Sequence, residues 1–173
     1  AGMLRELPQD VLALVPPRFR SGNDDWIGLS GRARVVVYNP GLITPDKLPR
    51  RLDDVTAAEY SGKFGIAPTN ASFQSFVTAM RVADGEEAAQ AWLDDMQANG
   101  VQTYENNVQI LEAVEADQVA LGLLNHYYWF ERAAEVGQEA MTSVVAYTEP
   151  GDPGSLVNIS GVGILAGAAD NPD

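Results

Sequence analysis

The chain lacks cysteine altogether and has a single histidine, His126, among its 173 residues. Without cysteine there are no disulfides, thiolate metal ligands or cysteine nucleophiles. A lone histidine also argues against a metal site built from several histidines and against a histidine-based catalytic triad. These two scarcities remove many of the common catalytic and metal-binding arrangements from consideration.

Positive charge is scarce as well, with 11 Lys plus Arg against 24 Asp plus Glu and a formal net charge of −13. Coulomb repulsion opposes the approach of such a chain to phosphate-rich surfaces, so we expect no nucleic-acid partner and no anionic-membrane partner. No apolar run approaches the roughly 18 residues that a membrane span requires, so we expect no span in this chain. The apolar fraction of 46% suffices for a folded domain with a real core.

Strand and helix patterns alternate along the chain. Apolar and β-branched runs predict strands at 32–38, 63–67, 119–124, 141–147 and 156–164. Apolar residues at helical spacing predict helices at 71–82, 85–99, 108–116 and 127–136, with a shorter one at 10–15. This alternation predicts an α/β fold with a mixed, mostly parallel sheet flanked by helices on both faces.

Two of the predicted helices carry specific local signals, one a cap and the other a buried face. Asn70 is a plausible N-cap for the helix that follows it. In the helix predicted at 108–116, the spacing of Val108, Leu111 and Val114 predicts that all three are buried.

The segment Asn125-His126-Tyr127-Tyr128 lies where a buried strand ends and a helix begins. Ligands of open α/β sheets bind beyond the carboxyl ends of the strands, so polar side chains here occupy a usual site position. A protonated phenol is a poor ligand, but a hard, highly charged cation such as ferric iron displaces the proton and holds the phenolate. The alternative is that the aromatic residues only pack the helix on the sheet.

The turn that leads into the helix at 71–82 is a second candidate site. Its free N–H groups, the helix dipole, Ser72 and the Asn70 side chain favour an anion there, although ordinary N-capping explains the same residues. The polar segment 104–107 has the same two interpretations. His126 is a candidate ligand or a structural residue. We find no enzyme motif and expect no enzyme.

Five segments, taken in order, resemble the periplasmic ferric-ion-binding proteins of ABC iron transporters, and the similarity extends from about Leu4 to Leu165. These segments are Lys63-Phe-Gly-Ile-Ala-Pro-Thr-Asn-Ala-Ser-Phe73, Gly85-Glu-Glu-Ala-Ala89, Tyr104-Glu-Asn-Asn107, Asn125-His-Tyr-Tyr-Trp129 and Gly151-Asp-Pro-Gly154. The paired tyrosines are the most specific of them.

The resemblance implies that the chain forms a lobe of a type II periplasmic-binding-protein-like fold. Proteins with this fold have two lobes, which close about a hinge around the cargo. The resemblance assigns Tyr127 and Tyr128 as phenolate ligands of Fe3+ and His126 as at most a supporting residue. It also implies carbonate or phosphate as a synergistic anion, held by five residues: Asn70, Ala71, Ser72, Asn107 and Asn125.

The same resemblance implies delivery of iron to an ABC permease and its ATPase. It places the protein in the periplasm or on the extracellular face of the cytoplasmic membrane, with a lipid anchor as one option in the full-length protein. Because such proteins are about twice as long, we expect a fragment: residues 1–38 from the first lobe and hinge, 39–150 forming the second lobe, and 151–173 returning. A small organic or oxyanion cargo, or a ligand-sensing regulatory domain, remains an alternative.

Overall fold

The computed structural model describes residues 2–168. Its contacts divide the chain into two compact units: a larger one, Ala33–Leu156, and a smaller one formed by the residues before and after it. The chain therefore passes between the units twice, after Arg32 and after Leu156. No helix in the described residues is long and apolar enough to cross a membrane. The assignment of segments to lobes stays a prediction.

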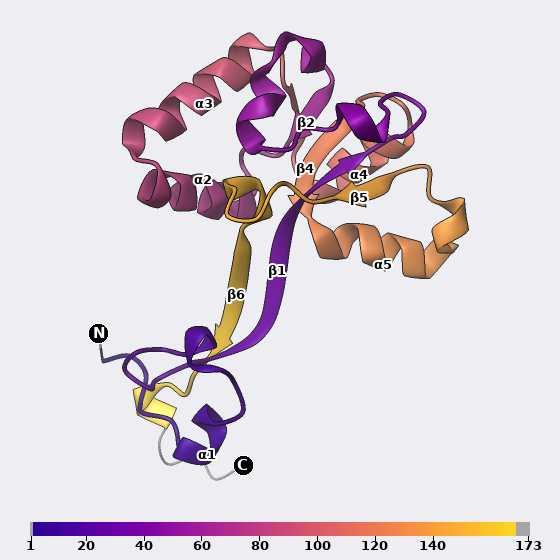
Figure 1. Cartoon of the computed structure of the whole chain (residues 1–173). Helices are drawn as coiled ribbons and strands as arrows, with labels where there is room; N and C mark the ends of the chain where they lie inside the picture. Colours follow the sequence, from indigo (N-terminus) through magenta and orange to yellow (C-terminus); the bar gives the residue numbers. More distant parts are fainter. Residues whose placement is uncertain (1, 169–173) are drawn as a thin grey trace. The chain divides into compact units, whose positions relative to one another are not determined.

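A mixed sheet forms the centre of the larger unit (Figure 1). Its strands follow the order β3 (Gln102–Thr103), β2 (Phe64–Ile66), β4 (Leu121–Asn125), β1 (Ile27–Tyr38) and β5 (Val144–Ala146). β6 (Val157–Val162), which belongs to the smaller unit, also pairs with β1. β2 runs parallel to β3 and β4, whereas β1 runs antiparallel to β4 and β5. All the strands on this path except β1 therefore share one direction, which confirms the predicted mixed, mostly parallel α/β sheet.

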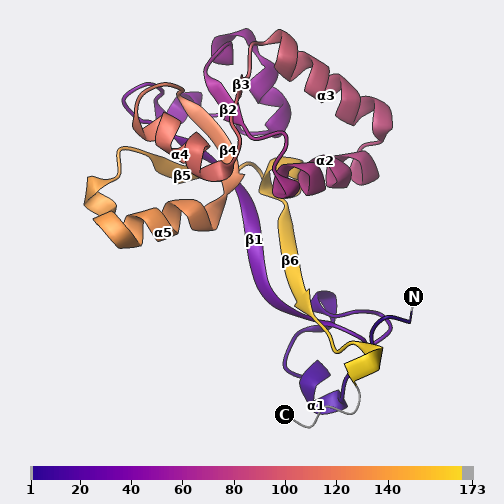
Figure 2. The ribbon, with the colours of Figure 1, turned by 180° about the vertical axis from the view of Figure 1, so that it is seen from behind.

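Helices cover both faces of this sheet (Figures 1 and 2). α2 (Ala71–Ala83) and α3 (Glu86–Ala98) cover one face, and α4 (Asn107–Glu115) and α5 (His126–Val136) cover the other. The β-branched run of β1 shows why both faces need a layer: Val36 packs with α2 and α3, while Val35 and Val37 pack with α4 and α5. Successive side chains of a strand point to opposite faces, so an uninterrupted apolar run marks a strand buried on both.

Gly122 in β4 allows α4 to approach the sheet closely. A Cβ atom at this position would collide with the Ile110 side chain and would touch Val114 at 3.4 Å. Ile110 and Val114 are both fully buried. A larger residue at 122 would therefore push α4, and with it the start of that helix, away from the strands.

Short helical turns connect these elements. α1 (Gln9–Leu12) is shorter than the helix predicted at 10–15, and the 3-10 turns are Pro17–Phe19, Pro45–Lys47, Leu52–Thr56, Ala58–Tyr60, Gln138–Ala140, Pro153–Ser155 and Ala166–Ala168. β1 begins at Ile27, five residues before the predicted start at 32, because its first part pairs with β6 although it lacks a β-branched run.

The prediction that Val108 is buried is wrong. Leu111 and Val114 are buried as expected, but 47% of Val108 is exposed. Helical spacing shows which residues share a face, yet it does not show how far the neighbouring layer extends over that face. Val108 lies where the cover over α4 ends.

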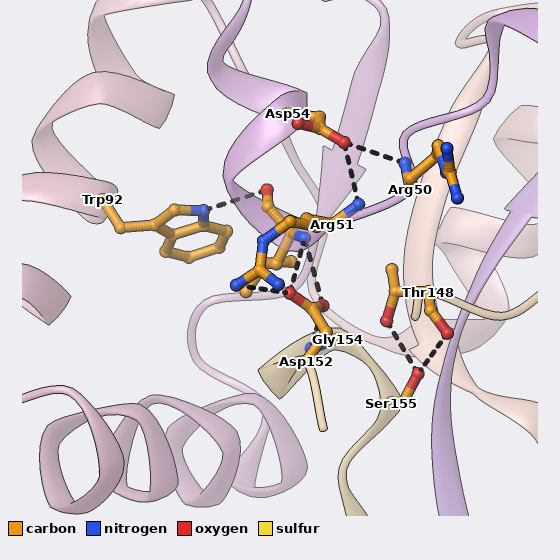
Figure 3. Close-up of polar contacts among 9 residues, drawn as sticks. Arg50, Arg51, Asp54, Trp92, Thr148, Asp152, Gly154 and Ser155 are labelled. Atoms are coloured by element: carbon orange, nitrogen blue, oxygen red, sulfur yellow. Dashed lines mark hydrogen bonds and ion pairs between the residues drawn. The ribbon is translucent and has the colours of Figure 1, made fainter. Parts of the chain in front are cut away.

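A buried carboxylate anchors the segment that leads from β5 toward β6 (Figure 3). Asp152 is only 4% exposed, and its oxygens accept hydrogen bonds from the Leu52 N–H at 3.1 and 3.2 Å and from the Gly154 N–H at 2.9 Å. The Arg51 guanidinium lies 3.8 Å away. The carbonyl of Leu52 in turn accepts a hydrogen bond from the Trp92 indole N–H at 3.4 Å. The turn at 151–155 is thereby fixed to the helical layer of α3.

Candidate functional site

The predicted site residues follow three neighbouring parallel strands. α2 begins after β2, α4 after β3 and α5 after β4, and these strands adjoin one another in the sheet. Since parallel strands end at a common edge, the three helix starts lie at that edge. Figure 1 shows α5 beginning at the tip of β4 and α2 beginning at the same end of the sheet. The fold therefore gathers segments that are up to 55 residues apart in sequence.

Asn70, Ser72 and Asn107 contact one another at this edge. Asn70 caps α2, with its Oδ1 accepting from the Ser72 N–H at 3.0 Å and from the Ser72 hydroxyl at 2.7 Å. The Asn107 amide donates to the same hydroxyl at 3.4 Å. Ala71 is the first residue of α2, so its N–H has no acceptor within the helix. The expected N-cap is thus confirmed, and it is joined to the start of α4.

Asn125, at the end of β4, is 3% exposed. Its Oδ1 accepts from an Arg34 guanidinium nitrogen at 3.4 Å, whereas its Nδ2 is buried and has no hydrogen-bond partner in the described part of the chain. A buried donor without an acceptor is costly, by about 1–3 kcal/mol, and natural proteins seldom keep one without a reason. This amide therefore provides a hydrogen-bond donor at the strand edge.

Arg34 lies beside the candidate site residues, although the predictions from sequence did not single it out. It is 2% exposed, and its guanidinium carbon lies 5.8 and 5.4 Å from the ring centroids of Phe73 and Phe76 in the first turns of α2. A cation is thereby buried between the start of α2 and Asn125. The signal was present, because an arginine directly before the run Val35-Val36-Val37 occupies a strand that is otherwise apolar.

The two phenols lie at the first turn of α5. Tyr127 and Tyr128 are each half-buried, and their rings stack with centroids 4.4 Å apart and planes inclined by 30°. Trp129 provides the packing instead: it is buried and its indole N–H donates to the carbonyl and the hydroxyl of Ser143, each at 3.1 Å. Tyr128 also packs, partly buried, against the same core cluster as Trp129.

His126 connects this turn to β1. Its Nδ1 accepts a hydrogen bond from the Ala33 N–H at 3.1 Å. Ala33 is the first residue of the larger unit, and the N–H of the next residue, Arg34, donates to the Leu156 carbonyl at 2.8 Å, at the other end of the unit. Both crossing points of the chain are therefore tied to the strand edge that carries Asn125 and the tyrosines.

Within residues 2–168 no three His, Cys, Asp or Glu side chains come close enough together to hold a metal ion. The assignment of the phenols as metal ligands stays a prediction.

Residues 1–172 match the family described as bacterial extracellular solute-binding protein. The chain belongs to this family. In open α/β sheets, the edge at which strands end and helices begin is the usual position for a ligand.

Curated relatives include the "Fe(3+)-binding periplasmic protein" of Serratia marcescens, which is 37% identical over 166 residues, covering 96% of this chain and 49% of the relative. The "Major ferric iron-binding protein" of Neisseria meningitidis serogroup B is 34% identical over 141 residues, covering 82% of this chain and 42% of the relative. The chain spans about half the length of the curated relatives it matches.

Solved structures show the same fold. Iron-bound HitA from Pseudomonas aeruginosa superposes with a TM-score of 0.87 at 40% identity, covering 95% of this chain and 53% of HitA. The Trichodesmium protein named IdiA or FutA, in complex with iron and citrate, superposes with a TM-score of 0.82 at 26% identity, covering 95% and 54%. The predicted resemblance to periplasmic ferric-ion-binding proteins is therefore confirmed.

Proposed function

We propose that this solute-binding chain supplies one lobe of a ferric-iron receptor. Tyr127 and Tyr128 bind Fe3+ as phenolates, and a carbonate or phosphate ion completes the coordination. Helix starts and amide donors hold that anion. The names of the relatives and the iron-bound HitA structure support iron as the cargo.

The observation that carries the proposal is the buried Nδ2 of Asn125, which has no acceptor among residues 2–168, beside the buried cation of Arg34. Donors and positive charge gathered in a place of low polarity favour an anion, because charge-assisted hydrogen bonds there are strong. The start of α2 adds the Ala71 N–H and the helix dipole. An anion at this edge would satisfy Asn125 and lie close to the stacked phenols.

The stacked phenols suit a hard trivalent cation. A free phenol has a pKa near 10, so it stays protonated at neutral pH unless a cation replaces the proton. Two adjacent phenolates and an anion would together offset the charge of Fe3+, and release of the anion would weaken the metal's hold. The affinity of the protein for iron then depends on the anion.

Delivery completes the proposed role. A receptor of this kind passes its iron to an ABC permease that is driven by an ATPase, in the periplasm or on the outer face of the cytoplasmic membrane. The names of the curated relatives and of the family favour that location.

The test is a visible-absorption titration with ferric nitrilotriacetate, in the presence of bicarbonate or phosphate, on the protein at the full length that its gene encodes. Phenolate ligands give a charge-transfer band. We expect Tyr127→Phe and Tyr128→Phe each to lower iron affinity at least tenfold and to weaken the band, since each removes one oxygen ligand. Tyr147→Phe is the matched control, because Tyr147 is 59% exposed and lies outside the site.

A normal band and normal affinity in both site variants would show that the ligand assignment is wrong. If the unaltered protein gives no band with either anion, the cargo is not phenolate-bound iron, and a small organic or oxyanion solute becomes the better hypothesis.

A further inference from the structure

A groove of about 540 Å³ runs between α4 and α5, on the helical layer outside the strand edge. Val108 and Tyr128 contribute apolar surface to it, and the largely buried Leu111 also lines it. Val108 is the residue whose helical spacing predicts burial but which is 47% exposed. About half of this aliphatic side chain is thus left uncovered by the described part of the chain.

Carboxylates line the rim of this acidic groove. Glu112 and Glu115 come from α4, and Glu131 and Glu135 come from α5. Residues three or four apart share one side of a helix, so each helix presents a pair of like charges to the groove. The only cationic side chain in the lining is Arg132, which pairs with Glu135 at 3.2 Å. The groove therefore carries a clear excess of negative charge.

Glu115 forms a fixed, ionised end of the groove. Burial alone would raise its pKa, but its carboxylate accepts hydrogen bonds from Ser143 and Thr142, and these lower the pKa below the usual 4.5. The shortest of these contacts is from the Ser143 N–H, at 2.8 Å. A carboxylate held in this way cannot turn away to lessen its repulsion from the other acids.

The spacing of the carboxylates argues against a bound metal ion. In the described part of the chain no three acidic or histidine side chains converge as metal ligands do. The negative charge is instead spread along two helices over an apolar floor. Charge distributed in this way complements several separate cationic groups that are joined by an aliphatic backbone or side chains.

We infer that the acidic groove docks a basic, partly aliphatic segment of a partner protein. Lysine or arginine side chains of the segment pair with the glutamates on the rim, and an aliphatic side chain covers Val108. Because Tyr128 also lines the groove, the docked segment lies against the turn that carries the tyrosine pair. This docking does not require bound iron and would occur in the iron-free protein.

A synthetic peptide probe tests the inference. The probe is a fluorescein-labelled 12-residue peptide of Lys, Arg and Leu, compared with a peptide in which Glu replaces every Lys and Arg. Anisotropy at 20 and 300 mM NaCl measures binding to the iron-free protein. We expect only the basic peptide to bind, and binding to weaken at the higher salt concentration.

Matched variants separate the groove from general attraction to a chain of net charge −13. Glu112→Gln combined with Glu131→Gln should weaken basic-peptide binding about tenfold, because it removes one charge from each wall. Glu87→Gln combined with Asp95→Asn removes the same charge from exposed positions of α3 and should change binding less than twofold. Equal weakening by the two pairs, or no binding of the basic peptide at low salt, would overturn the proposal.

The apolar floor has its own control. Val108→Ser should weaken peptide binding about threefold, because it removes aliphatic contact area, whereas Val82→Ser on α2, at a position 84% exposed, should have no effect. If Val108→Ser leaves the affinity unchanged, the segment does not dock on the groove floor and the proposal is wrong. The thermal midpoints of all variants should stay near that of the unaltered chain, since every substituted position is exposed.

Discussion

At the scale of single residues, the polar side chains with the largest structural roles were the hardest to predict. Asp152 belongs to a Gly-Asp-Pro-Gly turn, which the sequence identifies as a turn and as part of the resemblance. The sequence does not show that the carboxylate is buried and accepts from Leu52, 100 residues away in the chain. Arg34 is similar, because its environment is formed by α2 and Asn125. Such partners are set by tertiary structure and leave no local pattern.

Asp152→Ala should lower the free energy of unfolding by about 2–3 kcal/mol, since it leaves the buried Leu52 N–H without its acceptor. Urea denaturation followed by tryptophan fluorescence measures this, and Trp92 is a suitable reporter because its indole bonds to the Leu52 carbonyl. Asp152→Asn keeps one acceptor oxygen and should cost less than Asp152→Ala. Equal costs would mean that the charge near Arg51 matters and the hydrogen bonds do not.

At the scale of helices and strands, local patterns predicted most of the fold. The spacing in α2 and the Asn70 cap gave its start at Ala71 correctly, because helical period and capping are both short-range signals. The early start of β1 was missed, since the segment from Ile27 to Gly31 has two glycines and is defined by pairing with β6. For the site, the sequence placed Asn70, Ser72 and Asn107 at helix starts, but only the adjacency of β2 and β3 brings them together.

The start of α2 provides a test of the anion role, which rests on the proposed function. Ser72→Ala removes the hydroxyl that joins Asn70 to Asn107, while the helix and its Asn70 cap remain. We expect the gain in iron affinity on adding phosphate to fall about tenfold, the usual effect of losing one hydrogen bond to a charged group. Ser75→Ala is the control on the same helix, because Ser75 is exposed and bonds only to the Ala71 carbonyl.

Affinities measured with and without phosphate distinguish the outcomes. A loss of iron affinity that is equal in both conditions would remove Ser72 from the anion site while leaving the tyrosine ligands in place.

At the scale of the whole molecule, the two units differ in how much core supports them. The larger unit has a buried cluster on each face of its sheet, whereas the described part of the smaller unit has one cluster built on Leu7, Leu12 and Ile27. Stability follows buried apolar area, so the smaller unit should open at a lower free energy than the larger one. The strand β1 belongs to both units, and its buried half lies in the larger.

Hydrogen exchange with mass spectrometry should therefore show faster exchange in the smaller unit, and core substitutions should act unit by unit. Leu12→Ala, at a fully buried position, should cost the smaller unit about 2–4 kcal/mol and speed exchange around Ile27 while leaving β4 unchanged. Leu123→Ala, also fully buried, should speed exchange in β4 and throughout the larger unit. If Leu12→Ala accelerates β4 as much as it accelerates the segment around Ile27, the units unfold together.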